Sequence, residues 1–173
     1  MIKEINPNDV WCLSPEAREF IYKDIPRSSL IVEFGSGRGS LTLAEDGYTI
    51  YTFENDKQWL NKYKHPNLYY FHAPLVEFLD NHKIKWYEQN IVRSVIMKNQ
   101  NNIKLIIVDG PIGRIGREGI LKCREIFNKL TCPFLFDDTN RHAELDIATR
   151  FARLTNRKIA TITGKEKDFS IVI

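Results

Sequence analysis

Several features that define large classes of proteins are scarce or missing in this sequence. It has three cysteines in 173 residues, Cys12, Cys123 and Cys132, with no Cys-x-x-Cys pair and no zinc-type Cys/His spacing. This favours a reducing, cytoplasmic setting over a disulfide framework. No apolar run approaches the roughly 20 residues of a membrane-spanning helix, so no membrane span is expected. The first residues also lack the basic-then-apolar pattern of a signal peptide.

The sequence also has little net charge. Its 25 lysines and arginines against 22 aspartates and glutamates give a net charge of +3. A nucleic-acid-binding protein usually carries a stronger and more clustered basic excess, so nucleic acid is not the expected partner. The charge is uneven, because residues 1–102 hold 12 basic and 13 acidic side chains and residues 103–173 hold 13 and 9. The second half is therefore the expected side for an anionic ligand.

The apolar content of the sequence is sufficient for a folded core. Its hydrophobic fraction is 43%, with 12% aromatic residues, which is typical of a globular chain and not of a disordered one. A length of 173 residues matches one domain of about 100–200 residues. We therefore predict a single domain over residues 1–173, with an N-terminal helical segment over 1–29 and a core over 30–173.

Short apolar runs alternate with amphipathic stretches along the chain. The runs predict seven strands, at Leu30–Phe34, Tyr48–Glu54, Leu68–His72, Lys104–Val108, Phe134–Phe136, Lys158–Thr163 and Phe169–Ile173. The other stretches predict helices after Ser14 and at Asp56–Lys64, Trp86–Lys98, Gly116–Leu130 and Asn140–Thr155. This alternation predicts an α/β fold, with a mostly parallel sheet and helices on both faces. The last two strands are expected to form an antiparallel hairpin.

The ends of the predicted strands carry the polar residues of a candidate site. In an open parallel sheet, ligands bind at the carboxyl ends of the strands. Four of the predicted strands end in glycine-rich or acidic segments, which are Glu33–Ser40, Glu54–Asp56, Asp109–Pro111 and Asp137–Asn140. We therefore expect these four segments to meet at one edge of the sheet.

The first of these segments combines three glycines with a preceding acid. Gly35, Gly37 and Gly39 let the backbone turn sharply and let a ligand approach it closely. In the dinucleotide-binding fingerprint the third glycine comes three residues after the second, which is not the spacing here. Glu33 would repel a pyrophosphate but could engage an amino or sulfonium cation. The alternative is an ordinary strand-to-helix turn.

Glu54 ends the second predicted strand, 19 residues after Gly35. A carboxylate at this place can accept hydrogen bonds from both hydroxyls of a ribose, and about 20 residues is the spacing expected for that role. The alternative is an exposed turn acid. Together with the glycine segment, Glu54 favours a ligand that contains a nucleoside.

Taken together, these segments resemble the class I S-adenosylmethionine-dependent methyltransferases. The resemblance covers about residues 14–173 and rests on the glycine segment, Glu54, Asp109-Gly-Pro and Asp137-Asp138. It implies a Rossmann-like, seven-stranded sheet with a C-terminal antiparallel hairpin. A more local pattern is similar to small bacterial methyltransferase-like proteins that are related to sugar O-methyltransferases. That pattern consists of Ala73-Pro-Leu, Trp86-Tyr, Val-Asp109-Gly-Pro and Asp137-Asp-Thr-x-Arg141.

The resemblance implies a set of cofactor-binding residues. Glu33 and the backbone of the glycine segment would hold the methionine part of S-adenosylmethionine, and Glu54 would bind its ribose. Many family members have an acid after the third strand that meets the adenine amino group. This chain has Ala73 in that region, so the contact comes from the backbone or from elsewhere. The full set is Glu33, Gly35, Ser36, Gly37, Gly39, Glu54, Asn55, Ala73, Asp109 and Gly110.

Three acids at the ends of neighbouring strands form a candidate metal site. Asp109, Asp137 and Asp138 would repel one another unless they were protonated or bridged by a cation. Oxygen ligands suit Mg²⁺ or another hard divalent cation rather than zinc. In metal-dependent O-methyltransferases the corresponding acids hold such an ion, which positions an acceptor hydroxyl and lowers its pKa. The alternative is that Asp137 or Asp138 caps the helix that follows.

The acceptor side is expected near the same acids. An alcohol needs a base before it can accept a methyl group, and His142 is the candidate beside Asp109 and Asp138, although it could equally be a surface histidine. Arginines in this region could clamp a carboxylate or phosphate on the acceptor. The alternative is that they belong to solvated turns. These arginines are Arg114, Arg117 and Arg141.

The predicted function is O-methylation of a small sugar-containing or anionic acceptor, assisted by a divalent ion or working without one. One alternative is a non-catalytic regulator or scaffold that binds S-adenosylmethionine. Another is N-methylation of RNA or protein. That option is disfavoured because Val108-Asp-Gly-Pro stands where amino-methylating enzymes often carry an Asn/Asp-Pro-Pro-aromatic tetrad. A homo-oligomer that completes the acceptor site is a further expectation.

Overall fold

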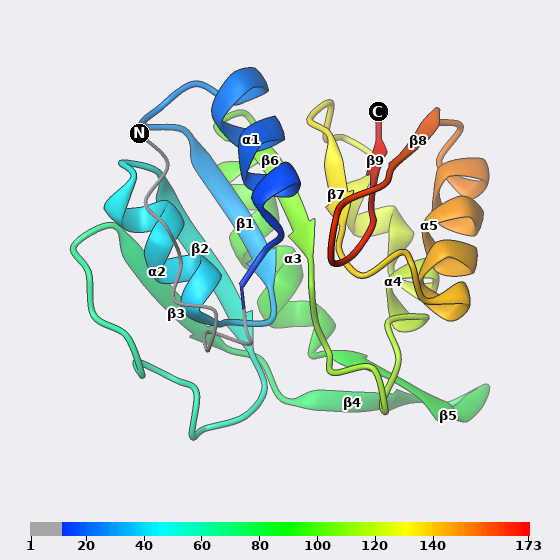
Figure 1. Ribbon diagram of the computed structural model, residues 1–173. Coiled ribbons are helices and arrows are strands. Elements are labelled where there is room, and N and C mark those ends of the chain that lie inside the picture. Colours follow the sequence, from blue (N-terminus) through cyan, green and yellow to red (C-terminus); the bar gives the residue numbers. More distant parts are fainter. Residues whose placement is uncertain (1–11) are drawn as a thin grey trace.

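The apolar runs of the sequence become the strands of one seven-stranded sheet in a computed structural model that describes residues 12–173 (Figure 1). The strand order is β3-β2-β1-β6-β7-β9-β8. All neighbouring strands are parallel except β9, which is antiparallel to both β7 and β8. The strands are β1 (Leu30–Phe34), β2 (Thr49–Glu54), β3 (Leu68–His72), β6 (Ile103–Val108), β7 (Phe134–Phe136), β8 (Ile159–Ile162) and β9 (Phe169–Val172).

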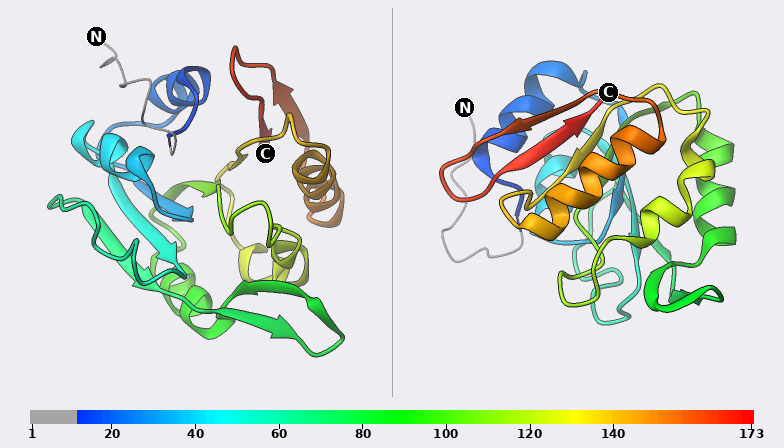
Figure 2. Two further views of the ribbon diagram at one scale, coloured as in Figure 1. Left: turned by 60° about the horizontal axis from the view of Figure 1, so that its bottom comes forward. Right: turned by 90° about the vertical axis from the view of Figure 1, so that its right-hand side faces the viewer.

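Helices cover both faces of this sheet (Figure 2). One face packs against α1 (Pro15–Asp24) and α2 (Arg38–Glu45). The other packs against α3 (Gln89–Asn99), α4 (Gly119–Lys122), the short 3₁₀ helix η1 (Arg124–Phe127) and α5 (His142–Leu154). The central strand β6 serves both layers, because Leu105 and Ile107 join the first core and Ile106 and Val108 the second. The predicted fold class is confirmed.

A second, two-stranded sheet was not predicted from the sequence. It consists of β4 (Leu75–Phe78) and β5 (Asn81–Tyr87), and it lies at the carboxyl-end edge of the main sheet, at the bottom of Figure 1. The expected helix Trp86–Lys98 was therefore wrong at its start, since Trp86 pairs with Val76 in the hairpin and the helix begins at Gln89. Trp86 and Tyr87 are fully buried against the core.

Two other predicted helices also differ from the structure. Residues 56–64 form turns, with Trp59 N–H donating to the Asp56 carbonyl three residues earlier, and Asn61 in a left-handed conformation stops any continuation. The stretch Gly116–Leu130 is divided into α4 and η1. At the N-terminus, Ser14 caps α1 as predicted by accepting a hydrogen bond from Ala17 N–H at 3.1 Å. Residues 1–11 of the predicted N-terminal segment lie outside the described residues.

Two hollows on the surface lie at the amino ends of the strands, away from the candidate site. One, of about 440 Å³, is lined by Leu30, Thr49 and Lys104 among others. The other, of about 770 Å³, is lined by residues that include Pro133 and Ile171. Within residues 12–173, none of the helices has the length and apolar character needed to cross a membrane.

Candidate functional site

The carboxyl ends of β1, β6 and β7 are aligned, because the backbone hydrogen bonds between these strands continue into the residues that follow them. Asp109 N–H donates to the Phe34 carbonyl at 3.1 Å, and Asp137 N–H donates to the Val108 carbonyl at 3.2 Å. Gly35 is joined to β2 in the same way, through the Phe53 carbonyl at 2.9 Å. Parallel pairing therefore brings the predicted segments to one edge, as expected from the sequence.

The glycine segment packs directly on the loop after β6. Gly35 has a left-handed φ of 89°, and a Cβ atom there would lie 2.9 Å from the Gly110 nitrogen. Only glycine fits this conformation and this contact. At the next turn, Gly37 is the N-cap of α2, and its N–H donates to the Ser40 hydroxyl at 3.0 Å. The segment is thus a tight strand-to-helix connection against the acidic side of the site.

Glu33 is a buried carboxylate inside this connection. Its exposed fraction is 2%, and it accepts a hydrogen bond from the Ser40 hydroxyl. Desolvation raises the pKa of Glu33 to about 8; the Ser40 hydrogen bond works against this rise, and the charges of Asp109 and Glu54 add to it. Within residues 12–173, no lysine or arginine forms an ion pair with Glu33. A cationic ligand group at this carboxylate would supply the missing counter-charge.

Glu54 lies at the end of β2, and the glycine segment holds its carboxylate. One oxygen accepts hydrogen bonds from Ser36 N–H at 3.0 Å and from the Ser36 hydroxyl at 2.6 Å. The other oxygen accepts from Asp56 N–H at 2.8 Å. Asn55 is half-buried beside it. The Ala73 N–H donates to the Glu54 carbonyl at 2.9 Å and extends the sheet, so an adenine contact at Ala73 would have to use another atom.

The three predicted metal ligands do meet. Oxygen atoms of Asp109, Asp137 and Asp138 lie within 4.8 Å of one another. Asp138 adopts a left-handed φ of 61°, which aspartate tolerates better than most residues. Neither aspartate of the pair caps α5, whose N-cap is Arg141 with no side-chain cap hydrogen bond. The helix-cap alternative is therefore not what the structure shows.

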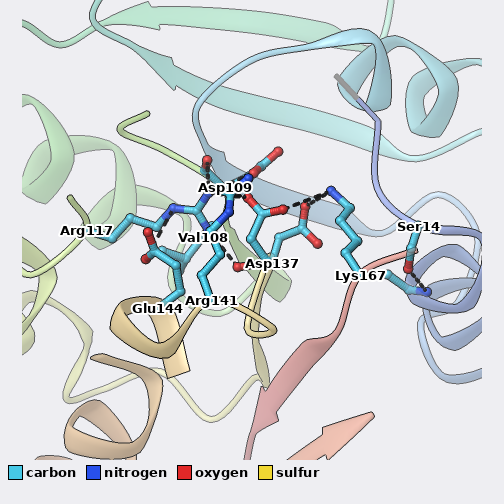
Figure 3. Close-up of polar contacts among 10 residues, drawn as sticks. Ser14, Val108, Asp109, Arg117, Asp137, Arg141, Glu144 and Lys167 are labelled. Atoms are coloured by element: carbon cyan, nitrogen blue, oxygen red, sulfur yellow. Dashed lines mark hydrogen bonds and ion pairs between the residues drawn. The ribbon is translucent and has the colours of Figure 1, made fainter. Parts of the chain in front are cut away.

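Three cations of the chain surround these acids (Figure 3). Arg117 contacts Asp109 Oδ1 at 3.1 Å and Asp138 Oδ2 at 3.0 Å, and Arg141 contacts Asp138 Oδ2 at 2.9 Å. Lys167 forms an ion pair with Asp137 Oδ2 and lies 3.5 Å from Asp138 Oδ1. We call Asp109, Asp137 and Asp138 the acidic cluster, and Arg117, Arg141 and Lys167 its cations. Each carboxylate of the cluster is engaged by a cation of the chain.

Arg117 does not lie where the sequence led us to expect it. Its exposed fraction is 2%, and it donates to the backbone carbonyls of Val108, Asp109 and Asp137 at 3.1, 2.7 and 2.7 Å. Glu144 adds a further carboxylate at 3.7 Å. The carbonyls and acids at the strand ends all need donors, and the two terminal nitrogens of one guanidinium supply them. The expected clamp on an acceptor is therefore replaced by a buried internal contact.

The other two arginines and the histidine are accessible. Arg141 has an exposed fraction of 53%, and Arg114 is exposed on the loop before α4. Arg141 reaches that loop at Gly113, where a Cβ atom would lie 3.3 Å from its guanidinium. His142 is exposed at the first residue of α5, next to Arg141. These three residues can face a bound molecule.

Burial changes the protonation of the acids. Desolvation and the charge of Asp109 raise the pKa of Asp137 to about 7, although Lys167 works against this rise. Desolvation also raises the pKa of Asp109 and of Glu144, with Arg117 as the main opposing influence. For Lys167 burial alone would lower the pKa, but Asp137 and Asp109 outweigh it and the pKa is raised. Lys167 is therefore held in its charged form.

Sequence reasoning missed Lys167 and Glu144 as members of the site. Lys167 belongs to the turn between β8 and β9, which the sequence marked only as a hairpin connection. The antiparallel direction of β9 brings that turn back to the carboxyl end of β7. The sequence offered one signal, the short turn between its last two predicted strands, but it did not show that the second of these strands pairs with β7.

Comparisons with known proteins show the fold but not a close relative. No known family profile matches the sequence, and no curated protein matches it. Among solved structures, a protein named as a methyltransferase from an antibiotic biosynthesis pathway of Anabaena variabilis has a TM-score of 0.58 at 14% identity, over 91% of this chain and 67% of that one. A TehB-like S-adenosylmethionine-dependent methyltransferase from Corynebacterium glutamicum has a TM-score of 0.55 at 16% identity, over 96% and 88%.

The methyltransferase MycE from the mycinamycin biosynthetic pathway is also similar. Its structure, in complex with Mg, S-adenosylhomocysteine and mycinamycin VI, gives a TM-score of 0.54 at 10% identity. The alignment covers 91% of this chain but only 44% of MycE, so this chain spans less than half the length of that protein. The neighbours share the Rossmann-like fold of class I S-adenosylmethionine-dependent methyltransferases, and the chain described here has that fold.

Proposed function

We propose that this chain is an S-adenosylmethionine-dependent methyltransferase that methylates a hydroxyl of a small sugar-containing or anionic acceptor. The observation that carries the proposal is a pair of buried carboxylates, Glu33 and Glu54, at the ends of adjacent strands beside the glycine segment. A buried carboxylate without a counter-charge costs free energy. A donor that carries an ammonium, a sulfonium and a ribose diol accounts for both residues.

The residues present fit this donor. The Glu33 carboxylate would pair with its cationic methionine part, and Glu54 would accept hydrogen bonds from the ribose, with Asn55 beside it. Each Glu54 oxygen already takes hydrogen bonds from backbone N–H groups, which fixes the carboxylate in place for a further contact. The close packing of Gly35 on Gly110 keeps the glycine segment next to Asp109. Donor and acceptor sides would therefore adjoin.

The donor supplies a methyl group already activated on a positively charged sulfur. The chain has to align the acceptor oxygen with the sulfur–methyl bond and remove the hydroxyl proton. Asp109 is suited to take that proton, because desolvation raises its pKa and makes its carboxylate more basic. His142 is a second acceptor for the proton at the open side of α5. Arg114 and Arg141 would hold a negatively charged part of the acceptor.

A divalent ion does not fit the acidic cluster as it stands. Oxygen ligands at this spacing suit a hard cation such as Mg²⁺, and Asp109, Asp137 and Asp138 are the residues that the sequence predicts as its ligands. However, Lys167 already contacts both Asp137 and Asp138, and Arg117 contacts Asp109 and Asp138. An ion would have to displace Lys167. The proposed reaction therefore contains no step through a metal.

A second candidate is a regulator that binds the donor without turnover. The ion pairs favour the regulator, because Arg117 and Arg141 already engage the Asp138 carboxylate and reduce its availability to an acceptor. The two candidates share the donor site and differ in the acceptor chemistry. Transfer of a methyl group to an acceptor separates them.

Isothermal titration calorimetry with S-adenosylmethionine and S-adenosylhomocysteine tests the donor site. We expect micromolar binding that weakens at least tenfold in Glu54→Gln, because a neutral amide cannot accept both ribose hydroxyls as strongly. Glu125→Gln is the matched control, since Glu125 is exposed on η1 and away from the site. Absence of donor binding to the unmodified chain would refute the proposal. Transfer of a labelled methyl group to a panel of sugars and sugar acids then distinguishes the enzyme from the regulator.

A further inference from the structure

We infer that Lys167 is the resident cation of the acidic cluster, occupying the place that a divalent ion would take between Asp137 and Asp138. Removal of its ammonium group would turn the cluster into a divalent-metal site. The consequence for catalysis, that methyl transfer needs no metal, rests on the proposed function. The consequence for metal binding does not depend on it.

The size of the cluster matches that of a metal site. Two ligand atoms on opposite sides of Mg²⁺ or Ca²⁺, each about 2.0–2.6 Å from the ion, are about 4.0–5.2 Å apart. The carboxylate oxygens of Asp109, Asp137 and Asp138 lie within 4.8 Å of one another. The ammonium group of Lys167 lies beside two of these carboxylates, in contact with Asp137 Oδ2 and 3.5 Å from Asp138 Oδ1. In the view of Figure 3, Arg117 approaches the acids from one side and Lys167 from the other.

Asp137 depends on Lys167 more than its neighbours do. Its side chain is fully buried. Among the described residues, Oδ2 is engaged by Lys167 and Oδ1 has no hydrogen-bond partner. Loss of Lys167 would leave a buried carboxylate with no cation in contact, which is strongly unfavourable. The carboxylate would then either take up a proton or recruit a cation from solution.

Lys167 is positioned by the fold and is not a mobile surface lysine. Its side chain has an exposed fraction of 21%. The turn that carries it is tied to α1, where Lys165 N–H donates to Glu16 Oε1 at 3.2 Å. On its other side, Thr139 N–H donates to the Asp168 carbonyl at 2.9 Å, so the turn is also tied to the segment after β7. These two contacts hold the lysine stem over the cluster.

The charges explain why one lysine suffices. Asp109, Asp137, Asp138 and Glu144 are four acids, and Arg117, Arg141 and Lys167 are three cations, so the fully ionised group carries one negative charge. Without Lys167 the group would carry two negative charges, and Asp137 would have no cation in contact with its carboxylate. A divalent ion would then balance the charge and supply the contact that Asp137 lacks.

Titration of Mn²⁺ followed by electron paramagnetic resonance tests this inference. We expect Lys167→Met to bind one Mn²⁺ per chain at least tenfold more tightly than the unmodified protein. Lys167→Arg keeps the positive charge and should bind no more Mn²⁺ than the unmodified protein. Lys165→Met is the matched control, because Lys165 is exposed on the same turn. The double variant with Lys167→Met and Asp137→Asn should lose the gained site.

The inference is overturned if the unmodified chain binds Mn²⁺ as tightly as Lys167→Met, or if Lys167→Met gains no binding. Should Lys167→Met fail to fold, Lys167→Gln is used, with the thermal unfolding midpoint measured with and without Mn²⁺. A midpoint that rises with Mn²⁺ only in the Lys167 variant supports the inference, and an equal rise in both proteins contradicts it. Donor binding is measured separately by calorimetry, so failure of the proposed function leaves the metal result interpretable.

Discussion

The hydroxyl of Ser40 donates a hydrogen bond to the buried carboxylate of Glu33, seven residues earlier in the chain. Ser40 lies in the first turn of α2, and Glu33 is the fourth residue of β1. The contact joins the strand to the helix beneath the glycine segment. It also favours the ionised form of Glu33 against burial and two neighbouring acids.

This arrangement predicts a pH-dependent stability. The pKa of Glu33 rises from 4.5 to about 8 on folding, mainly through desolvation. Between these values the unfolded chain releases a proton that the folded chain keeps, so stability falls as the pH rises from about 5 to 8. Glu33→Gln should remove this loss, which amounts to about 3–5 kcal/mol at pH 8. Urea denaturation at pH 5 and pH 8 measures the effect.

The comparison with Glu125→Gln checks that prediction, because Glu125 is exposed and should leave the pH profile unchanged. The stability of Glu33→Gln should still fall somewhat as the pH rises, because burial also raises the pKa of Asp137, to about 7. A variant that is no more stable than the unmodified chain at pH 8 would contradict the assignment of a raised pKa to Glu33.

Gly35→Ala should damage both stability and donor binding. A side chain at this position would need a left-handed backbone and would lie 2.9 Å from the Gly110 nitrogen. Gly47→Ala is a matched control, because Gly47 has a φ of 95° but no atom within 4 Å of the position that a Cβ atom would take. We expect a loss of about 1 kcal/mol for Gly47→Ala from backbone strain alone and about 3 kcal/mol or more for Gly35→Ala. Equal losses, or unchanged donor affinity in Gly35→Ala, would argue against the close packing.

Arg117→Met should be among the most destabilising substitutions in the chain. It removes donors from three backbone carbonyls and leaves Asp109, Asp138 and Glu144 without their buried partner. Breaking a buried ion pair in this way costs about 3–5 kcal/mol. Arg114→Met is the control, because an exposed arginine should change stability by about 0.5 kcal/mol or less. Similar unfolding free energies for the two variants would mean that Arg117 is not the centre of the cluster.

Asp138→Asn separates catalysis from donor binding. We expect kcat to fall at least a hundredfold while the donor Kd stays within twofold, because Asp138 shares Arg117 with Asp109, the proposed proton acceptor, and pairs with Arg141, which would hold the acceptor. Asp146→Asn is the matched control, since Asp146 pairs with Arg150 on the exposed side of α5. Stopped turnover in the variant together with normal turnover in the control supports the enzyme. Turnover that is unaffected in Asp138→Asn contradicts its placement at the acceptor.

Much of the fold was predictable because its strands are buried on both faces. Runs such as Leu30–Phe34 and Lys104–Val108 are largely apolar, and each ends in the polar residues that mark a carboxyl end. The β4–β5 hairpin was not predictable in the same way. Trp86 and Tyr87 come just before Val92, Val95 and Ile96, which repeat at helical spacing, and only the pairing with β4 shows that the helix starts after them.

The site was predictable to the level of segments but not of contacts. The four segments meet because parallel strands end at one edge, which the sequence order already indicates. Arg117 and Arg114 look alike in the sequence, yet one is buried and the other exposed. That difference arises from the direction of α4 and from carbonyl groups that no sequence pattern records. Lys167 could be placed only by the pairing of β9 with β7.

The position of β9 between β7 and β8 has a consequence for how the molecule is made. Asp137 is separated from Lys167 by 30 residues of chain, and it leaves the ribosome well before its counter-charge does. Until β9 inserts between its two neighbours, the acids at the strand ends have no ammonium group to face. The final hairpin therefore completes the electrostatics of a site whose other parts are already synthesised, and an unfinished chain cannot assemble it.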